Sequence, residues 1–288
     1  MELLRPSSLD QVPSDGVLLA GGTEVVPLLR DGILAADRLV DIRDVVPRGV
    51  AGNRIGAGTT LAELENEPAI PVALREACRL AASPQLRNMG TIGGNLLQST
   101  RCWYWRLKYP CRLHRVADGW GDRCHAQEGE HREHAIFAND FCASAHPSDV
   151  AAALLALGAR VQTSRRELPI DELYRVPDES NRNLVTLEPD ELILELELPA
   201  VESSVYLKAM DRKRWAFPQV GVAAARSSSD PPGGGLRVAL AGVAPVPWLL
   251  AGPEAPDASL AEATPLERTA WKVDVARALV RRALDALA

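Results

Sequence analysis

Hydrophobic and polar positions in the first part of the chain follow the order strand, turn, helix. A short apolar run ends at Gly21 and Gly22, which is typical of a buried strand entering a tight turn. Thr23 is placed to cap a helix over residues 25–31, and a second apolar strand segment follows that helix. Residues 15–43 are therefore predicted to form a compact βαβ unit.

Helical spacing dominates the next part of the chain. A strand, a turn and a helix start are predicted over residues 54–66, and helical spacing of apolar residues continues over residues 69–83. Ser148 or Asp149 is placed to cap an apolar helix that ends at Gly158. A further strand is predicted directly after that glycine.

A strand pattern replaces the helical one near residue 190. Residues 192–199 alternate strictly between apolar and polar, as a half-buried strand does. Two further strands, over residues 219–226 and 236–244, flank a Gly-, Pro- and Ser-rich hairpin loop over residues 227–235. The last predicted element is an amphipathic helix over residues 267–288. Its expected apolar face consists of Trp271, Val275, Leu279, Ala283 and Leu287.

Composition and charge argue against several classes of protein. Hydrophobic residues make up 47% and charged residues 24% of the 288 positions, as in an ordinary globular protein. The formal net charge of −6 argues against a nucleic-acid binder, whose footprint is basic. No apolar run reaches the roughly 18 residues of a membrane span, so no membrane insertion is expected. The N-terminus carries neither a secretory nor a twin-Arg leader pattern, so a cytoplasmic chain is expected.

Cysteine and histidine are crowded into one segment. Nine of the ten Cys and His residues fall between Cys102 and His146, and residues 101–141 show neither a helical nor a strand period. A long irregular segment in a compact protein needs its own source of order, which a bound metal or cluster supplies. In a reducing compartment, clustered thiols more often bind metals or do redox chemistry than form disulfides.

Four cysteines of this window form one candidate ligand set. They are Cys102, Cys111, Cys124 and Cys142, separated by 8, 12 and 17 residues. Four thiolates suit a [4Fe–4S] cluster, a [2Fe–2S] cluster or a zinc ion, and the spacing matches neither zinc ribbons nor the common ferredoxin runs. Histidines of the window are alternative ligands in a mixed zinc site, and a further alternative is a set of thiols without a metal. Cys78 lies on an apolar helical stripe and is expected to be a small buried side chain.

Two glycine-rich loops are candidate phosphate sites. The first covers residues 20–24, between a strand and a helix, and the second covers residues 90–95. Bare backbone N–H groups at a helix N-terminus suit a phosphate, although each loop alone is explained as well by a tight turn. Together they favour a ligand with an extended polar middle, such as a dinucleotide pyrophosphate. A Rossmann fingerprint fails, because Leu61 stands where the third glycine belongs after Gly56 and Gly58.

Two charged residues have ordinary interpretations on pattern alone. Asp149 is most simply the first-turn acid of a helix, which the helix dipole favours. Lys208, in a strand-like segment, is most simply a solvated lysine. Neither residue is assigned to a site without a ligand hypothesis.

Taken in chain order, five motifs give the sequence a family resemblance over nearly its whole length. The motifs are LLAGGTEV, RNMGTIGGNL, TRCWYWR, HPSDVAAALLALGA, and ILELELP with YLKAMDRK. Their order and spacing resemble the FAD-binding subunits of the molybdenum hydroxylases, among them xanthine dehydrogenases, carbon monoxide dehydrogenases and bacterial aldehyde oxidoreductases. The Thr-Arg-Cys sequence and the later cysteines are most similar to the subset with an additional [4Fe–4S] cluster, as in aldehyde oxidoreductases and 4-hydroxybenzoyl-CoA reductases.

The resemblance implies a fold and a division into domains. The implied fold is α+β, with a two-subdomain FAD-binding domain of the PCMH/vanillyl-alcohol-oxidase type, then a C-terminal α+β domain with a small antiparallel sheet and helices. The FAD-binding domain is expected over residues 1–188, with subdomains of about 1–52 and 53–188 and an iron–sulfur insertion over about 101–142. The C-terminal flavoprotein domain is expected over residues 189–288.

The resemblance also implies which residues hold the cofactors. Residues 18–25 and 91–95 are expected to wrap the FAD pyrophosphate, and Asp149 to contact the flavin end or the ribityl chain. Lys208 is expected near the isoalloxazine, and the backbone around Ile193 is expected to line the ring. The expected FAD-binding residues are Ala20, Gly21, Gly22, Thr23, Glu24, Val25, Thr91, Gly93, Gly94, Asn95, Asp149, Ile193 and Lys208. The expected [4Fe–4S] ligands are Cys102, Cys111, Cys124 and Cys142. No catalytic nucleophile or general base is expected in this chain.

The function that the resemblance implies is electron transfer. An FAD subunit of this kind passes electrons between an external acceptor and two partners, a molybdenum-cofactor large subunit and a [2Fe–2S] small subunit. NAD, a quinone, ferredoxin and oxygen all stay open as the acceptor, and export on a partner's signal to the periplasm is the alternative location. The alternative function is a zinc-stabilised Cys/His interaction or scaffold protein without flavin.

Overall fold

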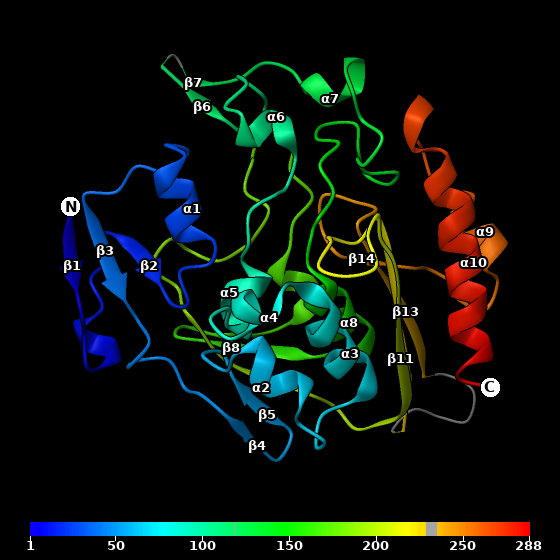
Figure 1. The fold of residues 1–288 in the computed structure, drawn as a ribbon, viewed down its shortest axis with the longest axis horizontal. Coiled ribbons are helices and arrows are strands. Elements are labelled where there is room, and N and C mark those ends of the chain that lie inside the picture. The colour runs from blue at the N-terminus through cyan, green and yellow to red at the C-terminus, as the bar shows by residue number, and fades with distance from the viewer. Residues whose placement is uncertain (118, 229–234) are drawn as a thin grey trace.

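In the part of the chain that the structure describes, three larger β-sheets follow one another from the N-terminal to the C-terminal side of the molecule, and a fourth sheet has two short strands (Figure 1). The computed structural model describes residues 1–117, 119–228 and 235–288. Most of the hairpin loop predicted over residues 227–235 therefore lies outside the described residues. None of the helices in the described ranges is long and apolar enough to cross a membrane.

The first sheet is small and parallel. Its strands, in spatial order, are β1 (Glu2–Leu4), β3 (Arg38–Asp41) and β2 (Val17–Leu19). α1 (Val25–Arg30) connects β2 to β3, so the βαβ unit predicted over residues 15–43 is confirmed. β1 was not predicted, because three residues are too short to show a period.

The second sheet is antiparallel and collects strands from distant parts of the chain. Its strands, in spatial order, are β4 (Val50–Ala51), β5 (Arg54–Gly56), β10 (Ile193–Glu197), β8 (Arg160–Thr163) and β9 (Glu167–Pro169). In β10, Leu196 pairs with Ile55 on one side and with Val161 on the other. The strand predicted over residues 192–199 is therefore confirmed as β10, and the domain boundary at residue 189 stays a prediction.

Helices form the largest apolar core together with the second sheet and with one face of the third sheet. The helices in this core are α2 (Leu61–Glu65), α3 (Val72–Ala81), α5 (Ile92–Leu96) and α8 (Asp149–Leu157), and α4 (Pro84–Arg87) adds no residue to it. Every residue of α8 is buried, and Gly158 ends the helix in the left-handed conformation. Ser148 caps it, since its Oγ accepts the N–H of Ala151 at 2.9 Å. The predicted start and end of this helix are confirmed.

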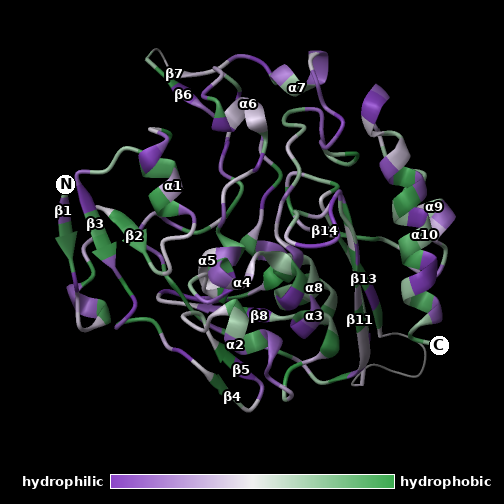
Figure 2. Ribbon diagram, viewed as in Figure 1, coloured by the Kyte–Doolittle hydropathy of each residue, from purple (hydrophilic) through white to green (hydrophobic). Residues whose placement is uncertain are grey.

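The third sheet is antiparallel and lies against the C-terminal helix. Its strands are β11 (Val201–Ala209), β12 (Val220–Ser227), β13 (Leu236–Ala241) and β14 (Trp248–Leu249), and its helices are α9 (Pro256–Leu260) and α10 (Trp271–Asp285). Figure 2 shows hydrophobic and hydrophilic residues alternating along α10. The predicted apolar face is right for Leu279, Ala283 and Leu287, but Trp271 and Val275 are only half-buried. The buried face is turned toward Lys272, which periodicity cannot identify as buried.

The cysteine window contains only short elements. They are α6 (Trp103–Arg106), β6 (Arg115–Val116), β7 (Gly119–Trp120) and α7 (His125–Glu128). Residue 118 of the window lies outside the described residues. Three 3₁₀ helices complete the fold, at Leu9–Gln11, Ile170–Leu173 and Glu267–Thr269. The irregular character predicted for residues 101–141 is confirmed.

Candidate functional site

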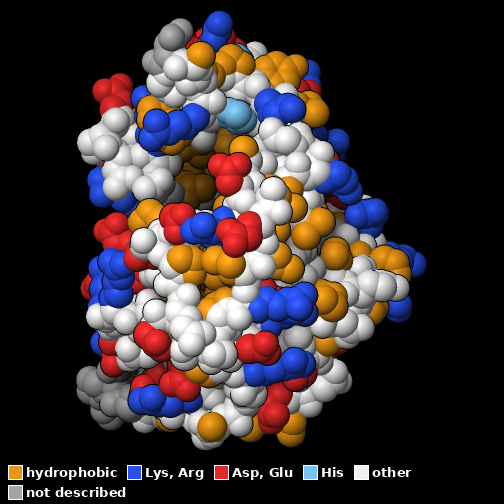
Figure 3. Space-filling view, turned by 90° about the vertical axis from the view of Figure 1, so that its left-hand side faces the viewer, with side chains coloured by type: hydrophobic (Ala, Val, Ile, Leu, Met, Phe, Trp, Pro, Cys, Tyr) orange, Lys and Arg blue, Asp and Glu red, His pale blue; other side chains and the backbone are white. Residues whose placement is uncertain are grey.

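A cavity of about 440 Å³ opens between the first and second sheets. Its size is typical of small-molecule and cofactor sites. The predicted FAD-binding residues in its wall are Ala20, Gly21, Gly22, Thr23, Glu24, Val25, Thr91, Gly93, Gly94 and Ile193. Figure 3 shows the side of the molecule that carries the first sheet, where a hollow contains hydrophobic side chains and has both signs of charge around it.

The first glycine loop packs directly against the second. A Cβ built on Gly21 would lie 1.7 Å from the carbonyl oxygen of Met89, so only glycine fits there. Gly22 has a φ of +72°, which glycine adopts without the strain that a side chain brings. The Val26 N–H donates to the Gly22 carbonyl at 3.1 Å, and Glu24 immediately precedes α1. The prediction that Thr23 caps this helix is therefore wrong, because Glu24 occupies the N-cap position and no side chain caps the helix there.

The second glycine loop is fixed by a cap and by a close contact. Thr91 caps α5, with its Oγ1 accepting the Gly94 N–H at 3.1 Å. A Cβ on Gly93 would lie 2.9 Å from the Cβ of Ala57, so glycine lets α5 approach the segment after β5. Ala57 also lines the cavity, although its loop fails as a Rossmann fingerprint. This glycine-rich segment therefore does lie at a cavity, although it is not part of a Rossmann dinucleotide site.

A smaller adjoining cavity carries the next two predicted residues. Asn95 and Asp149 line it, and it shares Thr23, Glu24 and Gly94 with the large cavity. The Ser148 hydroxyl donates to Asn95 Oδ1 at 2.6 Å, which ties the second glycine loop to the start of α8. The two cavities therefore form one elongated site.

Asp149 and Lys208 form a buried ion pair behind this smaller cavity. The Lys208 ammonium lies 2.9 Å from Asp149 Oδ2, and the two side chains are 0% and 1% exposed. Lys208 also donates to the Leu80 carbonyl, and the Tyr206 hydroxyl donates to Asp149 Oδ1. Burial raises the pKa of Asp149, and the attraction of Lys208 opposes that rise. The interpretation of Lys208 as a solvated lysine is therefore wrong, because its side chain is fully buried. The residues that it contacts lie far away in the sequence, so a local pattern could not identify them. Lys208 lines neither of the two cavities.

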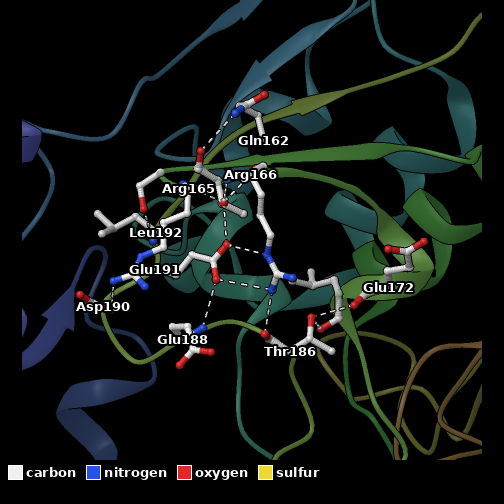
Figure 4. Close-up of polar contacts among 12 residues, drawn as sticks. Gln162, Arg165, Arg166, Glu172, Thr186, Glu188, Asp190, Glu191 and Leu192 are labelled. Carbon is white, nitrogen blue, oxygen red and sulfur yellow. Dashed lines mark hydrogen bonds and ion pairs between the residues drawn. The ribbon is translucent and has the colours of Figure 1, made fainter.

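A buried carboxylate supports the wall next to Ile193. Glu191 lines the large cavity, and its side chain is 1% exposed (Figure 4). The Thr163 hydroxyl donates to Glu191 at 2.7 Å, and Arg166 donates to it at 3.1 Å. Burial raises the pKa of Glu191, but these hydrogen bonds outweigh that effect and lower it. The network holds the segment before β10 in place against the cavity.

Several cavity residues were not identified from the sequence. They include Arg43, Arg48, Asn88, Met89 and Glu191. Each of the two arginines is paired with a carboxylate of this chain, Arg43 with Asp41 at 2.6 Å and Arg48 with Glu63 at 2.9 Å. They follow β3 in the chain and carry no motif, so only the folded chain places them at the site.

The four window cysteines meet in one place. Cys102, Cys111, Cys124 and Cys142 line a single small pocket, which also includes the side chain of Ser144. All five cysteines of the chain are free thiols, and Cys78 is buried in α3 as predicted. Within the ranges that the structure describes, no group of three or more His, Cys, Asp or Glu side chains is arranged to hold a metal ion. The sulfurs surround a shared pocket without converging on one ligand position.

Burial and mutual proximity govern the window thiols. Burial raises the pKa of Cys102 to about 11, and the neighbouring Cys111 and Cys124 add to the rise. Burial raises the pKa of Cys142 to about 12, again with a contribution from Cys124. The His134 Nε2 lies 3.3 Å from Cys102 Sγ, and burial lowers the pKa of this histidine to about 4. A metal or cluster that binds here must therefore displace protons from the thiols.

Fold and site together define the class of this protein, an FAD-binding, PCMH-like fold of mixed α+β type. The family model described as "FAD binding domain in molybdopterin dehydrogenase" matches residues 3–201. The chain belongs to this family, that of the FAD-binding subunits of molybdenum-containing oxidoreductases. The predicted family and fold class are confirmed.

Relatives of known function are FAD subunits of oxidoreductases. The aldehyde oxidoreductase FAD-binding subunit PaoB of Escherichia coli (strain K12) is 35% identical over 272 residues, which cover 88% of this chain and 82% of the relative. The carbon monoxide dehydrogenase medium chain of Hydrogenophaga pseudoflava is 36% identical over 96 residues, which cover 31% of this chain and 33% of the relative.

Solved structures of low sequence identity share the fold. A carbon monoxide dehydrogenase from Hydrogenophaga pseudoflava, which lacks the Mo-pyranopterin moiety, aligns with a TM-score of 0.68 at 24% identity, over 99% of this chain and 96% of that chain. Quinoline 2-oxidoreductase from Pseudomonas putida 86 aligns with a TM-score of 0.64 at 17% identity, over 98% of this chain and 94% of that chain.

Proposed function

We propose that this chain is the electron-transfer subunit of a molybdenum-cofactor hydroxylase that acts on an aldehyde or an N-heterocycle, and that it carries FAD and a [4Fe–4S] cluster. The observation that carries the proposal is the meeting of both glycine loops and Ile193 in the wall of one cavity. Bound FAD would exchange electrons one or two at a time, and the chain would bind and orient it. No nucleophile or general base of this chain takes part.

The wall of the large cavity suits an extended FAD molecule. Gly22 leaves backbone bare in the first loop, where a pyrophosphate would be bound. The N–H groups of Gly93 and Gly94 already donate to the Ala57 carbonyl and to Thr91 Oγ1, so the second loop would shape the wall rather than supply these donors. Arg43 and Arg48 lie on the same wall, where each is paired with a carboxylate of this chain. We propose that the ring lies against Ile193 in the large cavity, and that Asp149 contacts the flavin end or the ribityl chain from the smaller cavity, with Lys208 fixing its carboxylate.

The window suits a polynuclear cluster better than a single zinc ion. Four thiols line one pocket, and four thiolates are the usual complement of a [4Fe–4S] cluster. Four-cysteine zinc sites usually contain cysteine pairs separated by about two to four residues, whereas these cysteines are separated by 8, 12 and 17 residues. We therefore assign Cys102, Cys111, Cys124 and Cys142 as cluster ligands and leave the histidines outside the ligand set.

The proposed partners and electron acceptor are those that membership of the family suggests. We propose a molybdenum-cofactor large subunit and a [2Fe–2S] small subunit as partners, because the chain has no substrate chemistry of its own in this proposal. Electrons would leave or enter through an external acceptor. A reducing compartment such as the cytoplasm suits the free thiols on which cluster assembly depends.

The test is the visible spectrum of the purified chain and of its Cys111→Ser variant. The wild-type chain should show flavin absorption at about 450 nm over broad iron–sulfur absorption, and dithionite should bleach both. The variant should lose the broad absorption and keep the flavin bands when FAD is supplied in excess, since the glycine loops lie outside the window. A colourless wild-type protein with stoichiometric zinc would contradict the proposal and favour the zinc-stabilised scaffold.

A further inference from the structure

Glu24 lies in the wall of the FAD cavity, but its carboxylate points to the cysteine window. Its Oε1 accepts the Arg106 Nη2 at 2.6 Å, and its Oε2 accepts the Arg101 Nη2 at 2.6 Å. The Ser99 N–H donates to the same carboxylate at 3.2 Å. Both carboxylate oxygens are thus occupied by donors from residues 99–106, more than 70 positions away in the sequence.

The segment that binds Glu24 is the one that presents Cys102. The Cys102 N–H donates to Thr100 Oγ1 at 3.1 Å, and the Arg106 Nε donates to the Thr100 carbonyl at 2.9 Å. Cys102 immediately precedes α6, and Arg106 is the last residue of that helix. The position of Arg101 and Arg106 therefore depends on how the Cys102 segment is folded.

The three charged side chains are held in a largely dry environment. Glu24 is 16% exposed, Arg106 17% and Arg101 30%. Burial is the main effect on the pKa of Arg101 and lowers it, while Glu24 opposes the change. Two arginines share one carboxylate here, so loss of that negative charge leaves two half-buried cations facing each other. Among the described ion pairs, Glu24 is the carboxylate partner of both arginines. A movement of the Cys102 segment therefore moves the first glycine loop as well, because the arginines stay paired with Glu24.

We propose that Glu24, Arg101 and Arg106 form a junction that couples the two cofactor sites, so that a filled four-cysteine site strengthens FAD binding and bound FAD strengthens retention of the cluster. Glu24 is a positioning residue in this account, because its backbone shapes the first glycine loop while its side chain is held by the window. The coupling is reciprocal, as any coupling between two binding equilibria must be. The inference rests on the proposed function, since it needs both cofactors.

The test is a double-variant cycle on FAD affinity, measured by quenching of flavin fluorescence in the full chain. In the otherwise unchanged chain, Cys111→Ser removes the cluster and should weaken FAD binding about tenfold, within the usual range for coupled sites. In the Glu24→Gln background, FAD binding should already be weaker, and Cys111→Ser should then change it less than about twofold. The rate of iron release to a chelator should show the reciprocal effect. In the wild-type chain iron should be released faster when FAD is absent, and in Glu24→Gln the rate should not depend on FAD.

A matched control separates the junction from ordinary loss of a buried ion pair. Glu65 is also 16% exposed and pairs with Arg87 at 3.0 Å, and neither residue lines the four-cysteine pocket. Glu65→Gln should leave the tenfold effect of Cys111→Ser in place. If Glu24→Gln fails to fold, Arg106→Gln serves in its place, because the Glu24–Arg101 pair survives, and it should reduce the effect of Cys111→Ser to a few-fold.

The outcomes distinguish the inference from the proposed function. A wild-type chain that binds neither FAD nor iron contradicts the proposed function itself. A chain that binds both, but in which Cys111→Ser leaves FAD affinity unchanged or weakens it equally with and without Glu24, overturns the junction alone. Arg101→Lys keeps the positive charge and should therefore keep part of the coupling between the two sites. A coupling lost through misfolding would not depend on that charge.

Discussion

The FAD cavity and the cysteine window are stabilised by different interactions. The cavity wall consists of strand ends and helix starts that rest on the largest apolar core, with Ile55, Leu74 and Leu154 fully buried beneath it. In the window, Ile136 and Phe137 pack into the core of the third sheet, and the part around the cysteines has only a small core, formed by Cys124, Ala126 and Ala143. Packing alone can therefore keep the cavity in shape, whereas the window needs the group that its cysteines bind.

The largest expected effect is the loss of order in the window when its metal centre is lost. In Cys124→Ser, hydrogen exchange of residues 101–142 should accelerate by at least about 100-fold, because metal sites of this kind contribute several kcal/mol of local stability. Exchange in α3 and α8 should stay slow. Hydrogen exchange with mass spectrometry measures both regions in one sample.

Cys78 provides the matched control for that experiment. It is a fully buried thiol in α3, away from the four-cysteine pocket. Cys78→Ala should keep the iron and the protection of the window. Equal opening of α3 and the window in Cys124→Ser would show that the two regions do not differ in the way described here.

The next effect concerns the cavity side, where Lys208 neutralises Asp149. Replacing Lys208 with Met leaves a fully buried carboxylate without its cation, and this should lower the free energy of unfolding by about 3–5 kcal/mol. Urea unfolding followed by circular dichroism measures the loss. Arg79→Met, which breaks an exposed pair with Glu76, should cost less than about 1 kcal/mol. Similar values for both variants would contradict the buried ion pair.

A smaller effect tests Lys272, which joins the window to the C-terminal helix. Its ammonium donates to the carbonyls of Glu133 and Gly242 at 2.7 and 2.8 Å. Burial lowers its pKa from 10.5 to about 7, so the folded chain binds fewer protons than the unfolded chain between these values. The free energy of unfolding should therefore rise with pH in that window, and by about 2 kcal/mol between pH 7 and 9.

Lys272→Met isolates this contribution, because all other titrating groups are shared by the two proteins. The difference in stability between wild type and variant should change by about 2 kcal/mol over the same interval. A difference that is flat with pH would mean that Lys272 keeps its ordinary pKa in the folded chain.

Local signals in the sequence were sufficient for much of the fold and for the cavity wall. Ser148 and Gly158 mark the ends of α8, and the two glycine loops both lie at the cavity, because caps and tight turns depend on neighbouring residues. The prediction for Thr23 failed because the first hydrogen bond of this helix is accepted by the Gly22 carbonyl. The sequence alone does not distinguish such a start from a helix capped by a threonine.

Long-range contacts account for what the sequence did not predict. Lys208 is buried only because Asp149 and the Leu80 carbonyl meet it, and Lys272 is buried only because two distant carbonyls accept its hydrogens. Glu24 reads as part of a loop, although its partners are two arginines of the window. A charged side chain shows its partner only after the chain has folded.

The most direct test of the central claim is the cofactor content of the purified chain, with flavin measured after acid release and metals by mass spectrometry. The account predicts about one FAD and about four iron atoms per chain, with the iron lost in Cys111→Ser and the FAD retained in excess cofactor. One zinc ion per chain without flavin would contradict it.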